Sequence, residues 1–174
     1  LQKSYPTSSV GLTLEGDIYA SESRFAEAVA SYRKAIAVRS SPMLQIRLHR
    51  ALTAAGRGDE ADRVLASTIA AAPDDVALRL YAGERAVARR DWRAAVRHYE
   101  QAIASDPINA VALNNLSWSL HEIRDPKALS YAEAAYRLVP SSPAIADTFG
   151  LVLAALPDAS QGIERLKAAI AQNP

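Results

Sequence analysis

Apolar and small residues recur along the chain at spacings of four and three, and this pattern repeats about every 34 residues. Positions spaced by four and three lie on one face of a helix, so every copy of the pattern predicts a helix with an apolar stripe. Five copies follow one another. Three series of positions define the stripe: Ala28, Ala61, Ala95, Ala128 and Gly162; then Tyr32, Leu65, Tyr99, Ala132 and Leu166; then Ala35, Thr68, Ala102, Ala135 and Ala169.

A first helix precedes this second helix in every copy, with its own apolar stripe and a polar turn between the two. In the fourth copy the first stripe consists of Leu116, Ser117 and Leu120. Asp91 and Asp125 lie in the turns, where they are placed to cap the helices that follow. No segment shows sustained alternation of β-branched residues, so no strands are predicted. Prolines close the copies at intervals of 34, 33 and 34 residues: Pro73, Pro107, Pro140 and Pro174.

These boundaries predict an all-α chain with one domain over residues 9–174, preceded by an N-terminal extension at 1–8. The five helix-turn-helix repeats, with about ten helices, are expected at residues 9–41, 42–75, 76–109, 110–142 and 143–174. The chain begins at Leu1 and ends on Pro174 at a repeat boundary, so we interpret it as a fragment of a longer protein. Its last helix then exposes an apolar edge, which predicts end-to-end self-association of the fragment.

Residues at fixed positions of these copies resemble the tetratricopeptide repeat (TPR). The third copy matches best, through Gly83, Trp92, Ala95, Tyr99, Ala102 and Pro107. Departures occur at Glu15, His49 and Thr68, where the family pattern has Leu, Gly and Ala. The resemblance covers residues 9–174 and implies an α-α superhelix, the TPR solenoid, whose concave wall is made by the first helices. Stacked helix pairs of this kind bury a continuous core that one pair alone cannot.

Composition and charge exclude several classes of protein. Lys and Arg number 20 and Asp and Glu 19, so the net charge is +1, which argues against a generic binder of nucleic acid or of membrane surfaces. There is no cysteine, so disulfides and thiolate sites are excluded. No run of 18 apolar residues occurs, and no membrane span is predicted in this segment. Alanine accounts for 36 residues, which suits close helix packing.

The sequence offers no catalytic or metal-binding pattern. The three histidines, His49, His98 and His121, stand alone without the spacing of a metal site. Phosphate-binding loops, nucleophile elbows and catalytic triads are likewise without a supporting motif. We therefore expect neither an enzyme nor a cofactor. An arginine cluster in the third copy is interpreted as a solvated outer surface or as a contact patch for an acidic partner: Arg85, Arg89, Arg90, Arg93 and Arg97.

The resemblance to the tetratricopeptide repeat also implies which residues meet a ligand, because ligand contacts in that family come from fixed positions of the first helices. Asn114, Trp118 and His121 are spaced by four and three, so they share one face. Two interpretations of Trp118 stay open: a hot spot facing the groove, or a side chain packed against the neighbouring repeat. The candidate binding residues are Arg47, Arg50, Tyr81, Glu84, Asn114, Asn115, Trp118, His121 and Asp147.

The run at 114–120 and the run at 147–150 resemble the "NNLAWAL … ADTLGW" sequence of long bacterial TPR proteins. Residues 14–17, LEGD, resemble the openings of repeats in the same proteins. The closest resemblance is to the TPR lipoprotein of the exosortase/PEP-CTERM system. It implies a periplasmic or outer-membrane-associated protein of a Gram-negative bacterium; a cytoplasmic location is the alternative.

Together these features predict a non-catalytic protein-protein interaction scaffold that binds a peptide or protein segment in its concave groove. The resemblance places it in a bacterial envelope export or assembly system linked to exopolysaccharide or surface-protein sorting. Two alternatives remain. One is a module that binds exopolysaccharide directly through Trp118, Tyr81 and the amides. The other is a structural spacer or self-assembly segment.

Overall fold

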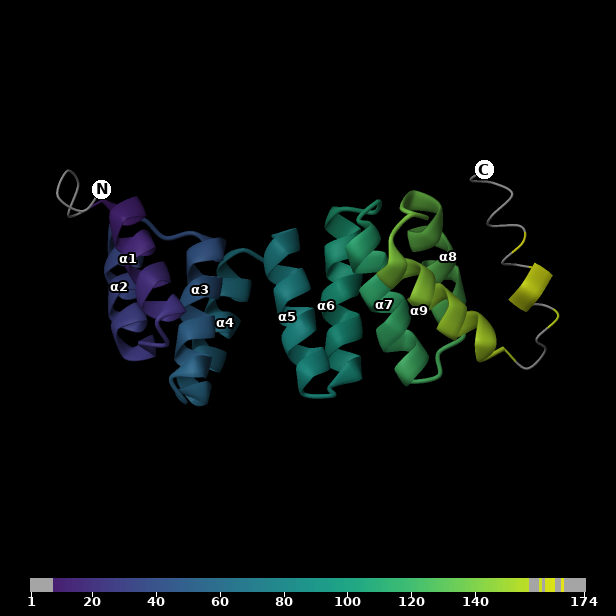
Figure 1. Ribbon diagram of the computed structural model, residues 1–174, viewed down its shortest axis with the longest axis horizontal. Helices are drawn as coiled ribbons and strands as arrows, with labels where there is room; N and C mark the ends of the chain where they lie inside the picture. Colours follow the sequence, from purple (N-terminus) through teal and green to yellow (C-terminus); the bar gives the residue numbers. More distant parts are fainter. Residues whose placement is uncertain (1–7, 157–159, 161, 165–166, 168–174) are drawn as a thin grey trace. The chain divides into compact units, whose positions relative to one another are not determined.

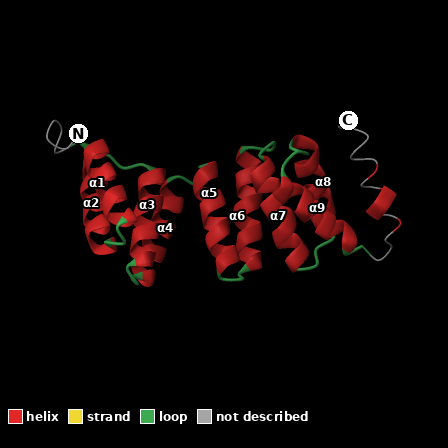
Figure 2. Ribbon diagram, in the orientation of Figure 1, coloured by secondary structure: helices red, strands yellow, loops and turns green. Residues whose placement is uncertain are grey.

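The computed structural model describes residues 8–156, 160, 162–164 and 167. Within these residues the secondary structure is helical and no strand occurs, as Figures 1 and 2 show. The prediction of an all-α helical-repeat fold is confirmed. Leu166 and Ala169, expected in the second helix of the fifth copy, lie outside the described residues. The helices with assigned bounds are α1 (Ser9–Ser21), α2 (Phe25–Val38), α3 (Pro42–Ala54), α4 (Gly58–Ala71), α5 (Val76–Ala88), α6 (Trp92–Ser105), α7 (Ala110–Glu122), α8 (Ala128–Leu138) and α9 (Pro143–Ala154).

Contacts divide the chain into two compact units, residues 1–78 and 79–174, and the boundary falls inside α5. In the first unit α2 packs on α1 and α3, and α3 packs on α4. In the second unit α7 packs on α6, α8 and α9, and α8 also packs on α9. The sequence predicts one domain over residues 9–174. A division into units is possible because each helix pair of a repeat array contacts only its neighbours, so no direct contact joins repeats that are far apart in the array.

Small residues allow the helices of one repeat to approach closely. Ala28, Ala61, Ala95 and Ala128 are all buried. In the first and third copies a glycine of the first helix faces a tyrosine ring of the second. A Cβ on Gly16 would lie 2.6 Å from Cδ1 of Tyr32, and a Cβ on Gly83 would lie 2.6 Å from Cζ of Tyr99. Carbon atoms do not approach so closely, so these two positions require glycine.

The second and fourth copies fill the same two positions differently. In the second copy, His49 stands where the first and third copies have glycine, and Leu65 stands where they have tyrosine. In the fourth copy the pair is Ser117 and Ala132. His49, Ser117 and Ala132 are buried. A larger residue in the first helix therefore accompanies a smaller one in the second, which keeps the core filled.

Helix starts and turns follow the local sequence. Side-chain oxygens of Ser8, Ser41, Asp91 and Asn109 each accept a hydrogen bond from the backbone N–H three residues later. Asp91 therefore caps α6 as predicted. Asp125 does not cap α8 in this way: its carboxylate accepts from the backbone N–H of Lys127 at 2.9 Å, before α8 begins at Ala128.

Candidate ligand-binding surface

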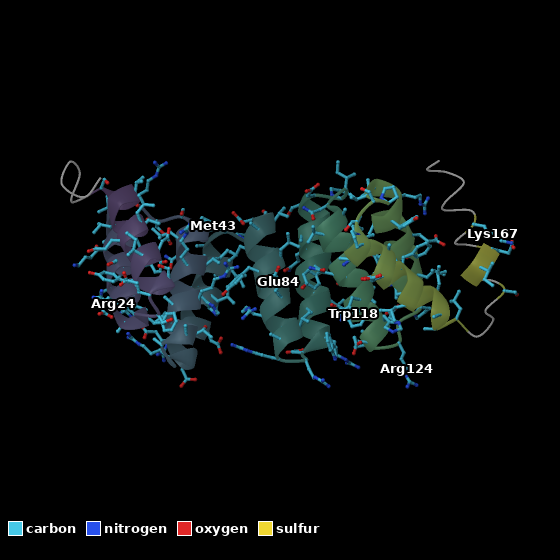
Figure 3. The ribbon with its side chains drawn as sticks, viewed as in Figure 1. Arg24, Met43, Glu84, Trp118, Arg124 and Lys167 are labelled. Carbon is cyan, nitrogen blue, oxygen red and sulfur yellow. The ribbon has the colours of Figure 1, made fainter. Side chains whose placement is uncertain are left out.

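An open pocket of about 210 Å³ lies in the second unit and is lined by side chains from α5, α6 and α7. Its lining residues are Glu84, Val87, Tyr99, Asn115 and Trp118. Figure 3 labels Glu84 on α5 and Trp118 on α7. Three of the residues predicted to meet a ligand thus share one pocket.

Helical spacing explains how these side chains meet. Glu84 and Val87 are three residues apart on α5, and Asn115 and Trp118 are three residues apart on α7, so each pair lies on one face. Trp118 is half-buried, whereas its neighbours Leu116 and Ser117 are fully buried. The indole therefore borders open space while the adjacent positions form the core.

Tyr99 forms the floor of this pocket. It is only 1% exposed, and burial raises the pKa of its hydroxyl to about 12. The negative charge of Glu84 raises this pKa further, whereas a hydrogen bond with Asn115 and the positive charge of Arg85 lower it. The hydroxyl therefore stays protonated at neutral pH, as a hydrogen-bonding group at the base of the pocket.

In the first unit, the side chains at three equivalent repeat positions bind one another. Asp17, Tyr32 and Arg47 hold the repeat positions of Glu84, Tyr99 and Asn115, at offsets of 67, 67 and 68 residues. The Tyr32 hydroxyl donates to Asp17 Oδ1 at 2.8 Å, and the Arg47 guanidinium pairs with the same carboxylate. This hydrogen-bonded pair raises the pKa of Arg47 above its ordinary value.

In the second unit a neutral amide takes the place of that guanidinium. Glu84 is exposed, and it makes no ion pair or hydrogen bond within the described part of the chain. At this repeat position the carboxylate of Asp17 is neutralised in the first unit, whereas the carboxylate of Glu84 is open to a ligand in the second.

The remaining predicted residues are dispersed. Tyr81 is 4% exposed, so it does not present its ring on the surface where it was expected. Asn114 is half-buried, and its Nδ2 donates to Asn115 Oδ1 at 3.4 Å. His121 is half-buried with its ring 5.9 Å from that of Trp118. Asp147 is exposed on α9.

Arg47 and Arg50 lie on α3 in the first unit. Arg47 lines a separate open pocket of about 410 Å³, and Arg50 is exposed. Because Arg47 is paired with Asp17, an incoming anion would have to compete with that carboxylate. The charge of Arg47 is thus already compensated within the first unit.

One lining residue, Tyr99, was not singled out as a binding candidate from the sequence. Tyr99 was assigned to the apolar stripe of the second helix, and its ring does lie there, against Gly83. The available signal was the hydroxyl, which must find a polar partner when the ring is buried. Acidic residues at the same first-helix position of both tyrosine-containing copies, Asp17 and Glu84, supply that signal.

The described residues show neither a metal-binding cluster nor a membrane-spanning helix. They contain no cluster of three or more His, Asp or Glu side chains able to hold a metal ion. Nor is any helix among them long and apolar enough to cross a bilayer.

In the arginine cluster, Arg89, Arg90, Arg93 and Arg97 are exposed. Arg85 is half-buried, with its guanidinium carbon 5.5 Å from the centroid of the Tyr81 ring.

Comparison with known proteins supports the repeat assignment. Residues 82–143 match the family model of the tetratricopeptide repeat, and this segment contains the whole pocket lining. No curated protein sequence matches the chain. A crystal structure of the MamA protein is similar with a TM-score of 0.75 at 17% identity, covering 94% of this chain and 91% of that one.

A second solved structure, YrrB, is described as a TPR protein with an unusual peptide-binding site. It is similar with a TM-score of 0.60 at 19% identity, covering 76% of this chain and 69% of YrrB. At such identities the likeness to both structures shows the fold alone, a TPR-type array of helix pairs.

Proposed function

We propose that this chain is a non-catalytic scaffold that binds a peptide or protein segment at the surface formed by α5 and α7. The observation that carries the proposal is the pocket in which Trp118 lies half-buried beside the open carboxylate of Glu84 and the amide of Asn115. The tetratricopeptide match over the same residues supports it, as does the peptide-binding site attributed to YrrB.

The pocket volume favours an anchor side chain over a whole small molecule. Small-molecule sites usually enclose about 300–1,000 Å³, whereas this pocket measures about 210 Å³. A tryptophan placed in such a pocket is the residue type that most often dominates binding energy in interfaces. Because the lining side chains are held on folded helices before a segment binds, the scaffold loses little conformational entropy on binding.

The test compares the wild-type chain with Trp118→Ala on a peptide array, followed by titration of the best peptides. Val111→Ala is the matched control, since Val111 is an exposed apolar residue of α7 outside the pocket. We expect Trp118→Ala to weaken binding by about tenfold or more, as for a hot spot, and Val111→Ala to change it less than about twofold. Circular dichroism should show unchanged helicity in both variants.

Two results would contradict the site. Equal peptide binding by wild type and Trp118→Ala would place the interface elsewhere. A collapse of helicity in Trp118→Ala would assign the indole to the core. An oligosaccharide array run in parallel addresses the exopolysaccharide alternative: sugar signals that depend on Trp118, without peptide signals, would replace the peptide proposal.

We also propose an envelope setting, in the periplasm or at the outer membrane, within an export or assembly system linked to exopolysaccharide or surface-protein sorting. What supports it is the resemblance of the runs at 114–120 and 147–150 to long bacterial TPR lipoproteins. Fractionation of cells that express the natural protein tests it. Recovery in the cytosol alone would refute the envelope setting without affecting the peptide proposal.

A further inference from the structure

We infer that the α5–α7 pocket receives the basic side chain of an arginine or lysine in the bound segment, with Glu84 as its ion-pair partner and Trp118 as its stacking surface. This inference rests on the proposed function and specifies which kind of peptide the site selects. Four observations lead to it: the open carboxylate, its counterpart in the first unit, the adjacent indole, and the charge of the predicted binding residues.

The first unit shows which group this carboxylate position binds. There Asp17 holds the guanidinium of Arg47, and the Tyr32 hydroxyl donates to the same carboxylate. The second unit keeps the carboxylate and the tyrosine but has Asn115 in place of the arginine. A guanidinium or ammonium group supplied by a partner would restore the missing member of this group of three.

The indole strengthens the preference for a cation. Trp118 lines the same pocket as Glu84, and tryptophan is the aromatic residue that attracts cations most strongly. A guanidinium stacks on aromatic rings and pairs with carboxylates at the same time. The chain contains an internal example: the Arg24 guanidinium carbon lies 4.4 Å from the Tyr19 ring centroid while its nitrogens bond Glu22 and Glu27.

The charged residues among the predicted binding residues of the second unit have the same sign as Glu84, although the unit also carries the arginine cluster. The predicted binding residues of α5, α7 and α9 include no Lys or Arg, and two of them, Glu84 and Asp147, are exposed carboxylates. The corresponding positions of α3 carry Arg47 and Arg50. These predicted binding residues therefore favour a basic over an acidic group in the ligand.

The polar groups at the base of the pocket complete the site. The Tyr99 oxygen and the Asn115 side-chain oxygen are acceptors for the N–H groups of a guanidinium or ammonium ion. Neither group competes with Glu84 for the charge, since both are neutral. A long basic side chain can then place its apolar stem against Val87 and its charged end against Glu84.

The probe is N-acetyl-arginine amide, compared with the isosteric neutral N-acetyl-citrulline amide, titrated into the full chain. The readout is the indole N–H signal of Trp118 in nitrogen-15 NMR spectra. The chain has two tryptophans, Trp92 and Trp118, so Trp118→Phe assigns the signal. We expect the arginine amide to shift this signal at concentrations at least about fivefold lower than the citrulline amide, and Glu84→Gln to remove the difference. Glu100→Gln, an exposed glutamate of α6 outside the pocket, is the matched control and should behave as wild type.

Equal responses to the two amides, insensitivity to Glu84→Gln, or no shift of the Trp118 signal would each overturn the inference. The peptide array separates this failure from that of the proposed function. Peptides that bind through Trp118 without enrichment in arginine or lysine would leave the scaffold standing and refute the basic-side-chain pocket. Absence of any peptide that depends on Trp118 would refute the scaffold site itself, and the inference with it.

Discussion

At the scale of single residues, Tyr32 and Tyr99 hold equivalent places, each buried beside a carboxylate. Burial, reinforced by Asp17 in one case and Glu84 in the other, raises both hydroxyl pKa values to about 12 from an ordinary value of 10.0. Both tyrosines therefore favour the protonated form in the folded state.

We predict that the free energy of unfolding falls as the pH rises from 10 to 12. The unfolded chain ionises these tyrosines near pH 10.0 and the folded chain near pH 12, so the stabilisation is complete below pH 10 and is lost through this window. Each tyrosine contributes on the order of 1–3 kcal/mol. Urea denaturation at pH 9 and pH 11 measures the difference, and Tyr32→Phe and Tyr99→Phe should each make it smaller. An unchanged difference in both variants would contradict the assignment.

His98 gives a pH dependence on the acidic side. Its Nδ1 lies 3.5 Å from Nη1 of Arg79, whose side chain is buried. Burial, followed by the positive charges of Arg79 and Arg97, lowers the pKa of His98 below 6.5. The folded state thus favours neutral His98, which can accept a hydrogen bond from Arg79.

Protonation of His98 is therefore predicted to destabilise the second unit. The unfolded chain takes up this proton near pH 6.5 and the folded chain only at lower pH, so stability decreases as the pH falls below 6.5. Denaturation midpoints recorded between pH 7.5 and pH 5 should show a smaller decrease for His98→Gln than for wild type. Parallel curves for the two proteins would mean that other groups account for the acid sensitivity.

The sequence could predict the positions of Glu84, Asn115 and Trp118, because the repeat register fixes which face of a helix a residue occupies. The repeat register does not determine how deeply a side chain is buried. Tyr81 shares a repeat position with Asn115, yet it is buried. Nor does the repeat register show ion pairs between distant residues: Arg47 and Asp17 lie 30 residues apart in the sequence, and their pairing is seen only in the fold.

At the scale of helices and turns, the existence of the helices follows from their apolar period, whereas the turn geometry does not. In each of the first four repeats, the turn between the two helices has one residue in the left-handed region: Ser23 (φ 59°), Gly56 (φ 74°), Arg90 (φ 57°) and Arg124 (φ 59°). Only one of these is glycine, the residue that adopts this conformation without strain. The sequence therefore predicts the turns but not their shared left-handed residue, because three of the four residue types give no sign of it.

Close helix packing predicts opposite effects for two kinds of glycine. Gly16→Ala and Gly83→Ala place a methyl group against the buried rings of Tyr32 and Tyr99, so we expect each to destabilise the chain by about 1–3 kcal/mol. Gly58→Ala is the control: Gly58 begins α4 with no described atom within 4 Å of an added Cβ, and alanine there should stabilise by up to about 1 kcal/mol. Urea midpoints measure all three. Gly16→Ala or Gly83→Ala at or above wild-type stability would show that the rings move aside.

At the scale of the whole molecule, the division into two units concerns how stability is distributed. Hydrophobic contacts form one cluster around Leu12, Tyr32 and Leu52 in the first unit and another around Tyr99, Leu116 and Phe149 in the second. In a repeat array, stability is a sum of repeat and nearest-neighbour terms, so a local perturbation need not spread. The sequence shows the repeats but not where this coupling is weakest, because the 34-residue pattern continues across the boundary inside α5.

Hydrogen exchange in the matched variants Gly16→Ala and Gly83→Ala tests how stability is distributed between the two units. We predict that Gly16→Ala accelerates amide exchange in α1–α4 and leaves α6–α9 within about twofold of wild type, whereas Gly83→Ala does the reverse, because each substitution strains the core of one unit. Uniform acceleration in both variants would mean that the chain opens as one cooperative unit. The result also bears on binding: if the units open separately, the α5–α7 pocket keeps its geometry when the first unit is destabilised, and arginine-amide binding by Gly16→Ala should match that of wild type.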